Sequence, residues 1–308
     1  MSVKTIFFAS TIYIFLPLFL VPSTFSQPWI VDSSCPDNEQ AIFHECALQA
    51  IKVFDPPRLD NGDPDLRGVW RRTVAAHESI EAHPKTLDDQ ETSSSVVFPE
   101  SGFVPIQPWA EAQRKYNRIA YVHHNAICRL DGVPLSMYMT GLYQLSQTFQ
   151  NILIQGEEAH AFRMIPFSDS HTLGEEIKLW NGDSIGSWDQ NTFVVDTTNQ
   201  NARAWLDQRG RFFTDEAHVE ERFTLVDANT LHYQATVTDE NVFTQPFTIA
   251  IAFRRNASDF EIWEEACYED NAISREGFFN VGYKVYPGIS GDEARRLRDA
   301  WDLYEESR

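Results

Sequence analysis

Hydrophobic positions recur with two different periods along the chain, and the period changes near residue 142. Before that point, residues 37–54 and residues 108–122 carry apolar side chains at helical spacing, which predicts two helices. Asp37 is the expected N-cap of the first helix. After residue 142 the period falls to two, as in a half-buried strand. The pattern therefore predicts helices first and a β-rich region after them.

The segments around these helices carry weaker signals. Residues 63–70 indicate a first strand, and the polar, Ser-rich residues 76–105 predict a long loop. His123 and His124 follow the second helix and are expected to cap its C-terminus. Near the end of the chain, an apolar stripe behind Ser290 predicts a last helix that opens with a capping box.

Eight short segments rich in β-branched and aromatic residues follow residue 142, with turn residues between them. They are residues 148–155, 160–167, 175–182, 191–198, 218–227, 230–239, 247–255 and 260–269. Short strands at this spacing predict a mainly β fold, an antiparallel β-barrel of calycin-like shape with peripheral helices. A two-sheet β-sandwich is the alternative.

The N-terminus resembles a targeting segment. Lys4 precedes an apolar run and a small-residue cleavage site, so residues 1–26 are predicted to be a signal peptide, with a signal anchor as the alternative. Residues 27–62 then form an N-terminal helical segment, and residues 63–308 form one β-barrel domain with its peripheral helices. We expect a protein of the secretory pathway or a secreted protein, with no membrane association after cleavage.

Four cysteines fit an oxidising compartment and allow three pairings. Cys35 with Cys46 is the short-loop choice, which leaves Cys128 with Cys267 as a long-range bridge. A zinc site is disfavoured because the chain lacks C-x-x-C and clustered Cys/His spacing. Asn256 begins an N-A-S sequon between two predicted strands, so we expect an exposed turn that accepts a glycan.

Charge and missing motifs narrow the function classes. The formal net charge is -20, which repels phosphate backbones and so argues against a nucleic-acid partner. The chain has no G-x-S-x-G, no P-loop, no G-x-G-x-x-G and no H-E-x-x-H. We therefore expect no cofactor. Neither the charge nor these motifs indicate an oligomeric state.

Strand alternation singles out two polar residues on apolar faces. Glu221 falls among the apolar residues of segment 218–227, and a buried carboxylate must be paired or protonated. Its partner must come from another strand, with Arg163 and Arg254 as candidates, because Arg222 lies on the opposite face. Tyr233 places a hydroxyl on an otherwise apolar face and is a candidate donor to a ligand. Arg222 is kept as a candidate for substrate binding.

The densest ionisable cluster is "GEEAHAFR", residues 156–163. In an extended conformation Glu158 and His160 share a face and form a candidate acid/base pair, with Arg163 close by. The simpler interpretation is a solvated turn. A metal site built on Glu157 and His160 is less favoured, because only two ligand types lie near each other.

The segment "WNGDSIGSWDQNTFVVDT" carries the remaining candidates. Residues 184–186 are predicted to form an irregular link between two turns. Trp180, Trp188 and Asp196 can border the mouth of a cavity, with residues 184–188 as its rim. On the residues alone, the two indoles are more simply core side chains at a barrel corner, and Asp196 a satisfied turn carboxylate. Both interpretations stay open.

Taken together, six motifs resemble a broad set of secreted bacterial and fungal proteins that are largely uncharacterised. The motifs are "PDLRGVW", "PWAEAQ", "CRLDGVP", "LWNGDSIGSWDQNTFVVDT", "ERFTLVDANTLHYQATVTDENVFTQPFTIAIAFRR" and "EACYEDN". They span residues 64–271 and include Cys128 and Cys267, which supports pairing these two. Within this set, the chain resembles the fungal hetero-Diels-Alderases of tropolone sesquiterpenoid biosynthesis.

This resemblance implies a cofactor-free pericyclase of secondary metabolism. A tropolone precursor would lose water to give an o-quinone methide, which adds stereoselectively across an alkene of a humulene-type terpene alcohol. Such a reaction needs an apolar pocket that excludes water and one or two donors on the tropolone oxygens. The partners are then these two small hydrophobic substrates. The alternatives are a non-catalytic carrier of a hydrophobic metabolite and a secreted hydrolase or dehydratase that uses Glu158 and His160.

Overall fold

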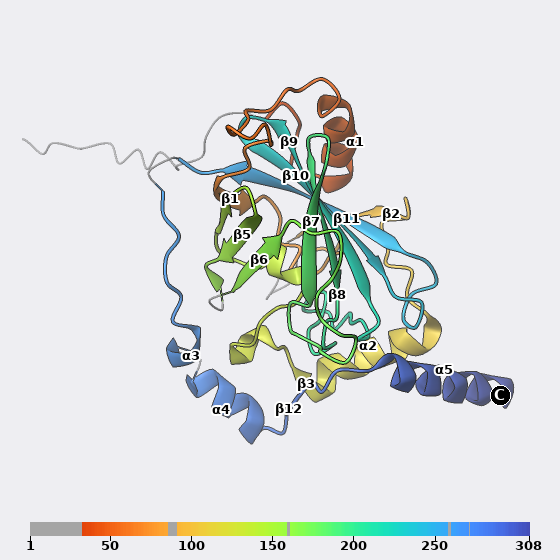
Figure 1. The fold of residues 1–308 in the computed structure, drawn as a ribbon. Coiled ribbons are helices and arrows are strands. Elements are labelled where there is room, and N and C mark those ends of the chain that lie inside the picture. Colours follow the sequence, from red (N-terminus) through yellow and green to blue (C-terminus); the bar gives the residue numbers. More distant parts are fainter. Residues whose placement is uncertain (1–32, 86–90, 159–160, 258–259, 271) are drawn as a thin grey trace, which may run out of the picture.

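A single antiparallel sheet, nearly closed into a barrel, forms the body of the protein (Figure 1). The computed structural model describes residues 33–85, 91–158, 161–257, 260–270 and 272–308. The sheet strands are β1 (Gly68–Arg72), β2 (Val96–Phe98), β4 (Tyr143–Gln147), β5 (Asn151–Gly156), β6 (Phe162–Pro166), β7 (Asp183–Asp189), β8 (Thr192–Thr198), β9 (His218–Asp227), β10 (Thr230–Thr238) and β11 (Phe247–Arg255). The predicted mainly β barrel is thus confirmed over the sandwich alternative.

The barrel consists of two meanders joined by β1. Its neighbour order is β6-β5-β4-β1-β11-β10-β9-β8-β7, and β2 pairs with β11 beside this path. The two end strands, β6 and β7, meet at an isolated parallel bridge between Phe167 and Gly186. A Cβ at residue 186 would lie 2.6 Å from the Phe193 ring, so only glycine allows this approach. We call the junction between β6 and β7 the seam.

Aromatic side chains fill the interior of the barrel. Phe193, Phe223, Tyr233 and Phe253 are all fully buried. The ring of Tyr233 lies 5.0 Å from that of Phe223 and 5.9 Å from that of Phe253, in tilted and edge-on arrangements. The middle of the barrel is therefore a packed core, and room for a ligand must be sought at its edges.

The structure differs from the predicted strand pattern in three segments, residues 175–182, 184–186 and 260–266. Residues 175–182 form an irregular segment in which Ile177 and Leu179 stay exposed, so this segment has no buried face. Residues 260–266 carry no strand, and the helix α3 (Cys267–Asp270) follows them. The predicted irregular link at residues 184–186 belongs to β7, because β8 pairs along its whole length.

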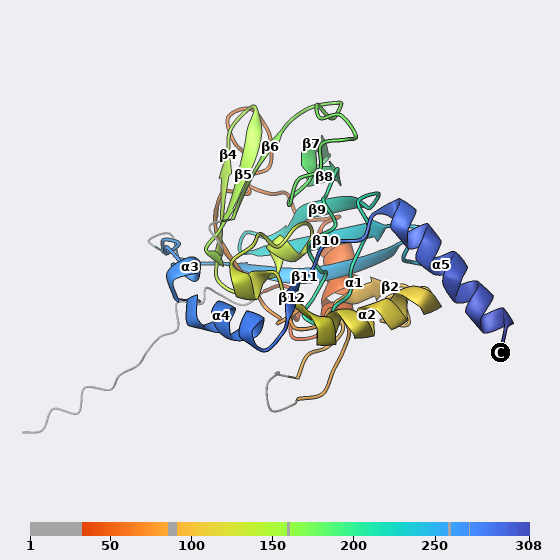
Figure 2. The same ribbon diagram turned by 90° about the horizontal axis from the view of Figure 1, so that it is seen from below.

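The predicted helices are present with changed details. They are α1 (Gln40–Ala50), α2 (Pro108–Ala120) and α5 (Gly291–Glu306). Figure 2 shows α2 and α5 next to each other beside the sheet. Glu39, not Asp37, is the N-cap of α1; the carboxylate of Asp37 instead accepts a 2.7 Å hydrogen bond from Arg254 Nε. Ser290 caps α5 as predicted, accepting from the amide of Glu293.

The remaining elements lie at the end of the molecule that carries α2. They are β3 (Tyr121–Val122), the 3-10 turns η1 (Asn125–Ile127) and η2 (Leu135–Met137), α4 (Ala272–Asn280) and β12 (Lys284–Val285), which pairs in parallel with β3. Because Tyr121 already ends α2 in an extended conformation, His123 and His124 do not cap this helix. The expected capping role is therefore wrong.

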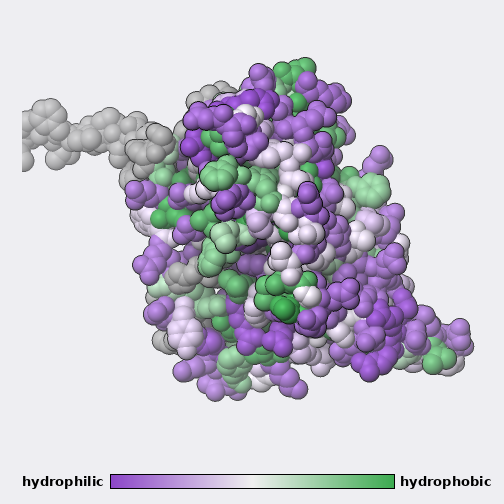
Figure 3. Space-filling model, in the orientation of Figure 1, coloured by the Kyte–Doolittle hydropathy of each residue, from purple (hydrophilic) through white to green (hydrophobic). Residues whose placement is uncertain are grey.

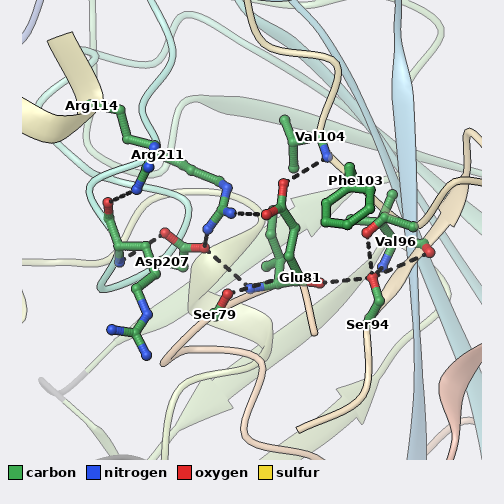
Figure 4. A network of polar contacts seen from close by, with 12 residues as sticks. Ser79, Glu81, Ser94, Val96, Phe103, Val104, Arg114, Asp207 and Arg211 are labelled. Carbon is green, nitrogen blue, oxygen red and sulfur yellow. Dashed lines mark hydrogen bonds and ion pairs between the residues drawn. The ribbon is translucent and has the colours of Figure 1, made fainter. Parts of the chain in front are cut away.

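A buried polar network ties the long loop between β1 and α2 to the rest of the fold (Figure 4). Arg211 donates to Asp207 at 2.6 Å and also to Glu81. The second oxygen of Glu81 accepts from the amide of Val104 at 2.8 Å. These bonds hold both ends of a segment that contains little regular structure, which explains how a long polar loop stays on the barrel.

Both predicted disulfides are present, Cys35–Cys46 and Cys128–Cys267. They are compatible with an oxidising, extracellular environment. The predicted exposure of Asn256 is wrong: the residue is 6 % exposed, and its backbone amide donates to Val69 O, so this turn folds against β1. The predicted signal peptide, residues 1–26, lies outside the described residues. Within the described residues, no helix is long and apolar enough to cross a bilayer.

The helix α1 packs on the barrel through a pair of histidines. His44 Nδ1 lies 3.1 Å from His232 Nε2, and His232 is fully buried. Burial lowers the pKa of His232 to about 3, with a further lowering by His44. The imidazole of His232 is therefore neutral in the folded protein at pH values where it is charged in the unfolded chain.

This pair predicts a loss of stability in acid. Between about pH 6.5 and pH 3 the unfolded state binds the extra proton, so the free energy of unfolding falls as the pH falls, by up to about 1.4 kcal/mol per pH unit. Urea unfolding of the wild type and of His232→Gln across this range measures the slope. The variant should have a shallower slope, whereas equal slopes would contradict the assignment.

Candidate functional site

A pocket of about 520 Å³ opens at the seam. Its walls come from β6, from the start of β7, and from the segment between them. The lining residues are Leu130, Phe162, Arg163, Met164, Pro166, Leu179, Trp180, Asn181, Gly182, Asp183 and Ser184. Most are apolar, and Figure 3 shows hydrophobic residues gathered on this face of the molecule, around β6. We call this site the seam pocket.

Arg163 is the buried charge of the seam pocket. Alternation along β6 turns Arg163 inward and leaves its neighbours Phe162 and Met164 exposed. Its Nη1 and Nη2 donate to the two oxygens of Glu221 at 2.9 and 2.5 Å, and Tyr233 donates to Glu221 at 2.9 Å. The predicted cross-strand partner of Glu221 is thus confirmed as Arg163. Burial opposes the charge on Arg163, but Glu221 raises its pKa overall.

One donor of Arg163 has no partner among the described residues. Nε is buried and makes no hydrogen bond, whereas Nη2 also reaches Ser184 Oγ at 3.2 Å. Glu221 accepts from both Nη1 and Nη2. The bond from Nη2 to Ser184 therefore lies on the other edge of the planar guanidinium, the edge that also carries the Nε–H. Both Arg163 and Ser184 line the seam pocket. A buried donor without a partner favours a ligand that supplies an acceptor.

Trp180 lines the seam pocket and also packs against the core, so it combines both predicted roles. The guanidinium carbon of Arg129 lies 5.8 Å from its ring centre. The centre of the His124 ring lies 6.4 Å from that of the indole. The indole therefore lies near a cation and an imidazole, and it lines the pocket while half-buried.

Most other predicted site residues lie elsewhere. Tyr233 is fully buried inside the barrel and does not line the seam pocket. Trp188 packs against Phe167 and Phe193 at the far end of β7. Arg222 forms surface ion pairs with Asp189 at 2.6 Å and Glu220 at 3.5 Å. The structure thus brings together Arg163 and Trp180 and leaves these three outside.

Asp196 lies on the outer face of β8, between two histidines. His171 Nε2 and His218 Nε2 lie 2.8 and 2.7 Å from its two oxygens. Burial would raise the pKa of Asp196, but the hydrogen bonds from His218 and His171 lower it overall. Because His171 also lies 3.3 Å from Asp183, which lines the seam pocket, these contacts fasten the segment between β6 and β7 to the barrel wall.

Glu158 belongs to a second, more polar pocket. This pocket of about 350 Å³ is lined by Thr140, Gly141, Glu157, Glu158, Trp263, Glu264, Glu265 and Ala266. Burial raises the pKa of Glu158, although a hydrogen bond from Thr140 opposes the shift. His160 lies outside the described residues, so the predicted acid/base pair has no geometry to report. Glu158 and Arg163 line different pockets.

A buried acid and a buried base lie close together near Trp180. Asp131 Oδ1 and His124 Nε2 are 3.4 Å apart, and both side chains are almost fully buried. Burial raises the pKa of Asp131 to about 7 and lowers that of His124 to about 3. At neutral pH the imidazole of His124 is therefore uncharged, and the carboxyl of Asp131 takes up and releases its proton near this pH. No group of three or more His, Cys, Asp or Glu side chains in the described part of the chain is placed to hold a metal ion.

We found no protein-family model and no curated protein that matches this chain. The site must therefore be interpreted from its own geometry. Sequence reasoning missed Phe162, Met164, Leu179 and Asn181, all of which line the seam pocket. Alternation along β6 could have indicated Phe162 and Met164: if Arg163 points inward, these two neighbours point outward.

Proposed function

We propose that this chain is a cofactor-free pericyclase that catalyses a stereoselective hetero-Diels-Alder addition in the seam pocket. The heterodiene is a tropolone o-quinone methide, and the second reactant is an alkene of a humulene-type terpene alcohol. The motif resemblance suggests the reaction class. The observation that carries the proposal is a mostly apolar pocket whose wall contains one buried, unsatisfied cationic donor, Arg163 Nε.

The chemistry requires no redox partner. Loss of water from a hydroxymethyl tropolone breaks one C–O bond and removes one hydroxyl proton, which leaves the o-quinone methide. Its methylene carbon and its oxygen then form two new σ bonds to the alkene carbons, and the product is a dihydropyran. A donor on an oxygen of the heterodiene draws electron density from it and so speeds attack by the electron-rich alkene.

Each feature of the pocket would contribute to this reaction. Arg163 Nε–H would donate to the tropolone oxygen without reorganisation, since Glu221 already holds the guanidinium. Trp180 would offer a flat face to the seven-membered ring. Holding both reactants in one orientation reduces the entropy of activation and selects one face of the alkene.

Chiral product analysis tests the proposal. The tropolone precursor and the terpene alcohol are mixed with wild type, with Arg163→Met/Glu221→Leu, or without protein. We expect faster formation of one stereoisomer with the wild type, and a loss of rate on the order of 100-fold in the double variant, which lacks the donor. The double variant removes both buried charges together, so its fold is retained better than with either single change.

Two outcomes would contradict the proposal. A product of unchanged rate and stereochemistry with wild-type protein, together with tight binding of the product, would support the carrier function instead. Consumption of an ester or glycoside without a second reactant would support a hydrolase, and Glu158→Gln would then be the variant to test, because Glu158 lines the other acidic pocket.

A further inference from the structure

The loop between β6 and β7 forms one wall of the seam pocket. We call residues 168–182 the seam loop; they contain no helix or strand. Four of its residues line the pocket, namely Leu179, Trp180, Asn181 and Gly182. The second half of the loop is held by the backbone: the amide of Leu179 donates to Asn199 O at 2.9 Å, and the amide of Asn201 donates to Leu179 O at 2.8 Å. These backbone bonds contain no titratable group.

The first half of the seam loop is held by side chains instead. Asp183 Oδ2, at the start of β7, accepts from the amides of Thr172 and Leu173, each at 3.2 Å. The ring of His171 lies between Asp183 and Asp196 of β8. Its Nδ1 is 3.3 Å from Asp183 Oδ2, and its Nε2 is 2.8 Å from Asp196 Oδ1. His171 thus connects the loop to two strands of the barrel.

The charge of His171 decides how many of these contacts are attractive. A neutral imidazole carries one N–H and one bare nitrogen, whereas the imidazolium carries two N–H groups and a positive charge. The contact of Nδ1 with Asp183 is an ion pair without an aligned hydrogen bond, so its attraction comes from the charge on the ring. Loss of the proton therefore leaves His171 bound to Asp196 alone.

The other titratable groups around His171 are mostly acidic. His218 Nε2, on β9, lies 2.7 Å from Asp196 Oδ2. Glu220 of β9 is the cross-strand neighbour of Asp196 and forms an ion pair with Arg222 at 3.5 Å. The seam loop itself adds three exposed carboxylates, Asp169, Glu175 and Glu176, and its Lys178 donates to Asp215 O. The imidazolium of His171 is thus the charge that complements its surroundings.

We infer that His171 is a pH-dependent latch for the seam pocket. The imidazolium holds the first half of the seam loop between Asp183 and Asp196. Loss of its proton frees residues 169–173 and also Asp183, which lines the pocket, so that molecules enter more readily. The loop therefore closes as the pH falls and opens as the pH rises through the range in which imidazoles titrate. The latch acts on any ligand of the pocket and does not depend on the proposed reaction.

Hydrogen exchange of the seam loop tests the latch. Exchange of a peptide that covers residues 168–174 is measured by mass spectrometry at about pH 5 and about pH 8, on either side of the usual imidazole range. The rates are corrected for the intrinsic pH dependence of exchange. In the wild type, protection should be about 3-fold to 10-fold higher at the lower pH, as expected for partly exposed ion pairs. His171→Gln, which keeps a donor but carries no charge, should show little difference between the two pH values.

His218→Gln is the matched control for this measurement. His218 contacts the same carboxylate as His171, but from β9 and not from the seam loop, so this variant should keep the pH dependence of the wild type. Acid weakens the whole fold through His232, so a general effect on stability has the opposite sign. An equal loss of pH dependence in both variants, or equal protection of the wild type at both pH values, would overturn the latch.

The rate of entry into the seam pocket tests the consequence of the latch. N-phenylnaphthylamine, an apolar dye that stays uncharged over this pH range, is mixed rapidly with the protein and followed by its fluorescence. The wild type should bind the dye faster at the higher pH, and His171→Gln should bind it at the faster rate at both pH values. Met164→Gln, in the pocket wall, should weaken dye binding and so assigns the dye to this pocket. A wild-type association rate that does not change with pH would show that the seam loop does not control entry, and would overturn the inference.

The outcomes are independent of those for the proposed function. A loop that closes in acid and slows dye entry, in a protein that accelerates no cycloaddition, would support the latch and contradict the reaction. Stereoselective cycloaddition together with a loop of constant protection would do the reverse.

Discussion

Replacing Glu221 with Ala is expected to lower the free energy of unfolding by about 3–5 kcal/mol. The carboxylate is fully buried and accepts from Arg163 and Tyr233. Its removal leaves the guanidinium of Arg163 in the core without a counter-charge, and desolvation of that charge is then uncompensated. Urea unfolding followed by circular dichroism measures the loss.

Two further variants make this prediction specific. Glu220→Ala changes the neighbouring residue of β9, whose side chain is 43 % exposed in its ion pair with Arg222, so a change within about 0.5 kcal/mol is expected. Glu221→Leu/Arg163→Met should be more stable than Glu221→Leu alone, because the second change removes the unpaired charge. Equal effects of Glu221→Ala and Glu220→Ala would show that the buried pair does not stabilise the barrel.

Removing the Cys128–Cys267 disulfide should destabilise the protein more than removing Cys35–Cys46. The bridges close loops of 139 and 11 residues. In the chain-entropy model these loops are worth about 5 and about 3 kcal/mol, respectively. The longer loop restricts the unfolded chain more, and it also joins the segment after β11 to the turn that follows α2.

The comparison uses two double variants, Cys128→Ser/Cys267→Ser and Cys35→Ser/Cys46→Ser, unfolded under identical conditions. Denaturation midpoints and slopes are both needed, because an opened loop changes the unfolded ensemble as well as its free energy. A larger loss on removing Cys35–Cys46 would mean that local packing of α1, rather than loop entropy, decides the contribution of a bridge in this fold.

The elements predicted best from the sequence are those whose signal is local. The helix α2 begins at Pro108 as predicted, because proline at the first turn and a helical apolar stripe act within a dozen residues. The hairpin of β9 and β10 follows from strict alternation on both sides of a short turn. In each case, residues close together in the sequence determine the element.

Local pattern failed where a strand depends on a distant partner. Residues 260–266 have a β-like composition, but no strand of the barrel lies beside them, and Trp263 stays 76 % exposed. Conversely, residues 184–186 look irregular, yet β8 pairs with all of β7 and imposes an extended conformation. Sheet propensity expresses packing against neighbours more than a backbone preference, so composition alone misassigned both segments.

For the site, alternation along β9 showed by itself that Glu221 is buried and needs a cationic partner from another strand, and the chain offered Arg163 and Arg254 equally. Closure of the barrel decided between them, because Arg163 and Glu221 are separated by 58 residues and meet only when β6 reaches the interior near β9. The same closure leaves β6 and β7 joined by one bridge, and the seam pocket opens there. Within a strand, alternation decides which residues share a face, so the sequence indicates this locally. Partners and pockets depend on which strands become neighbours, and only the tertiary structure decides that.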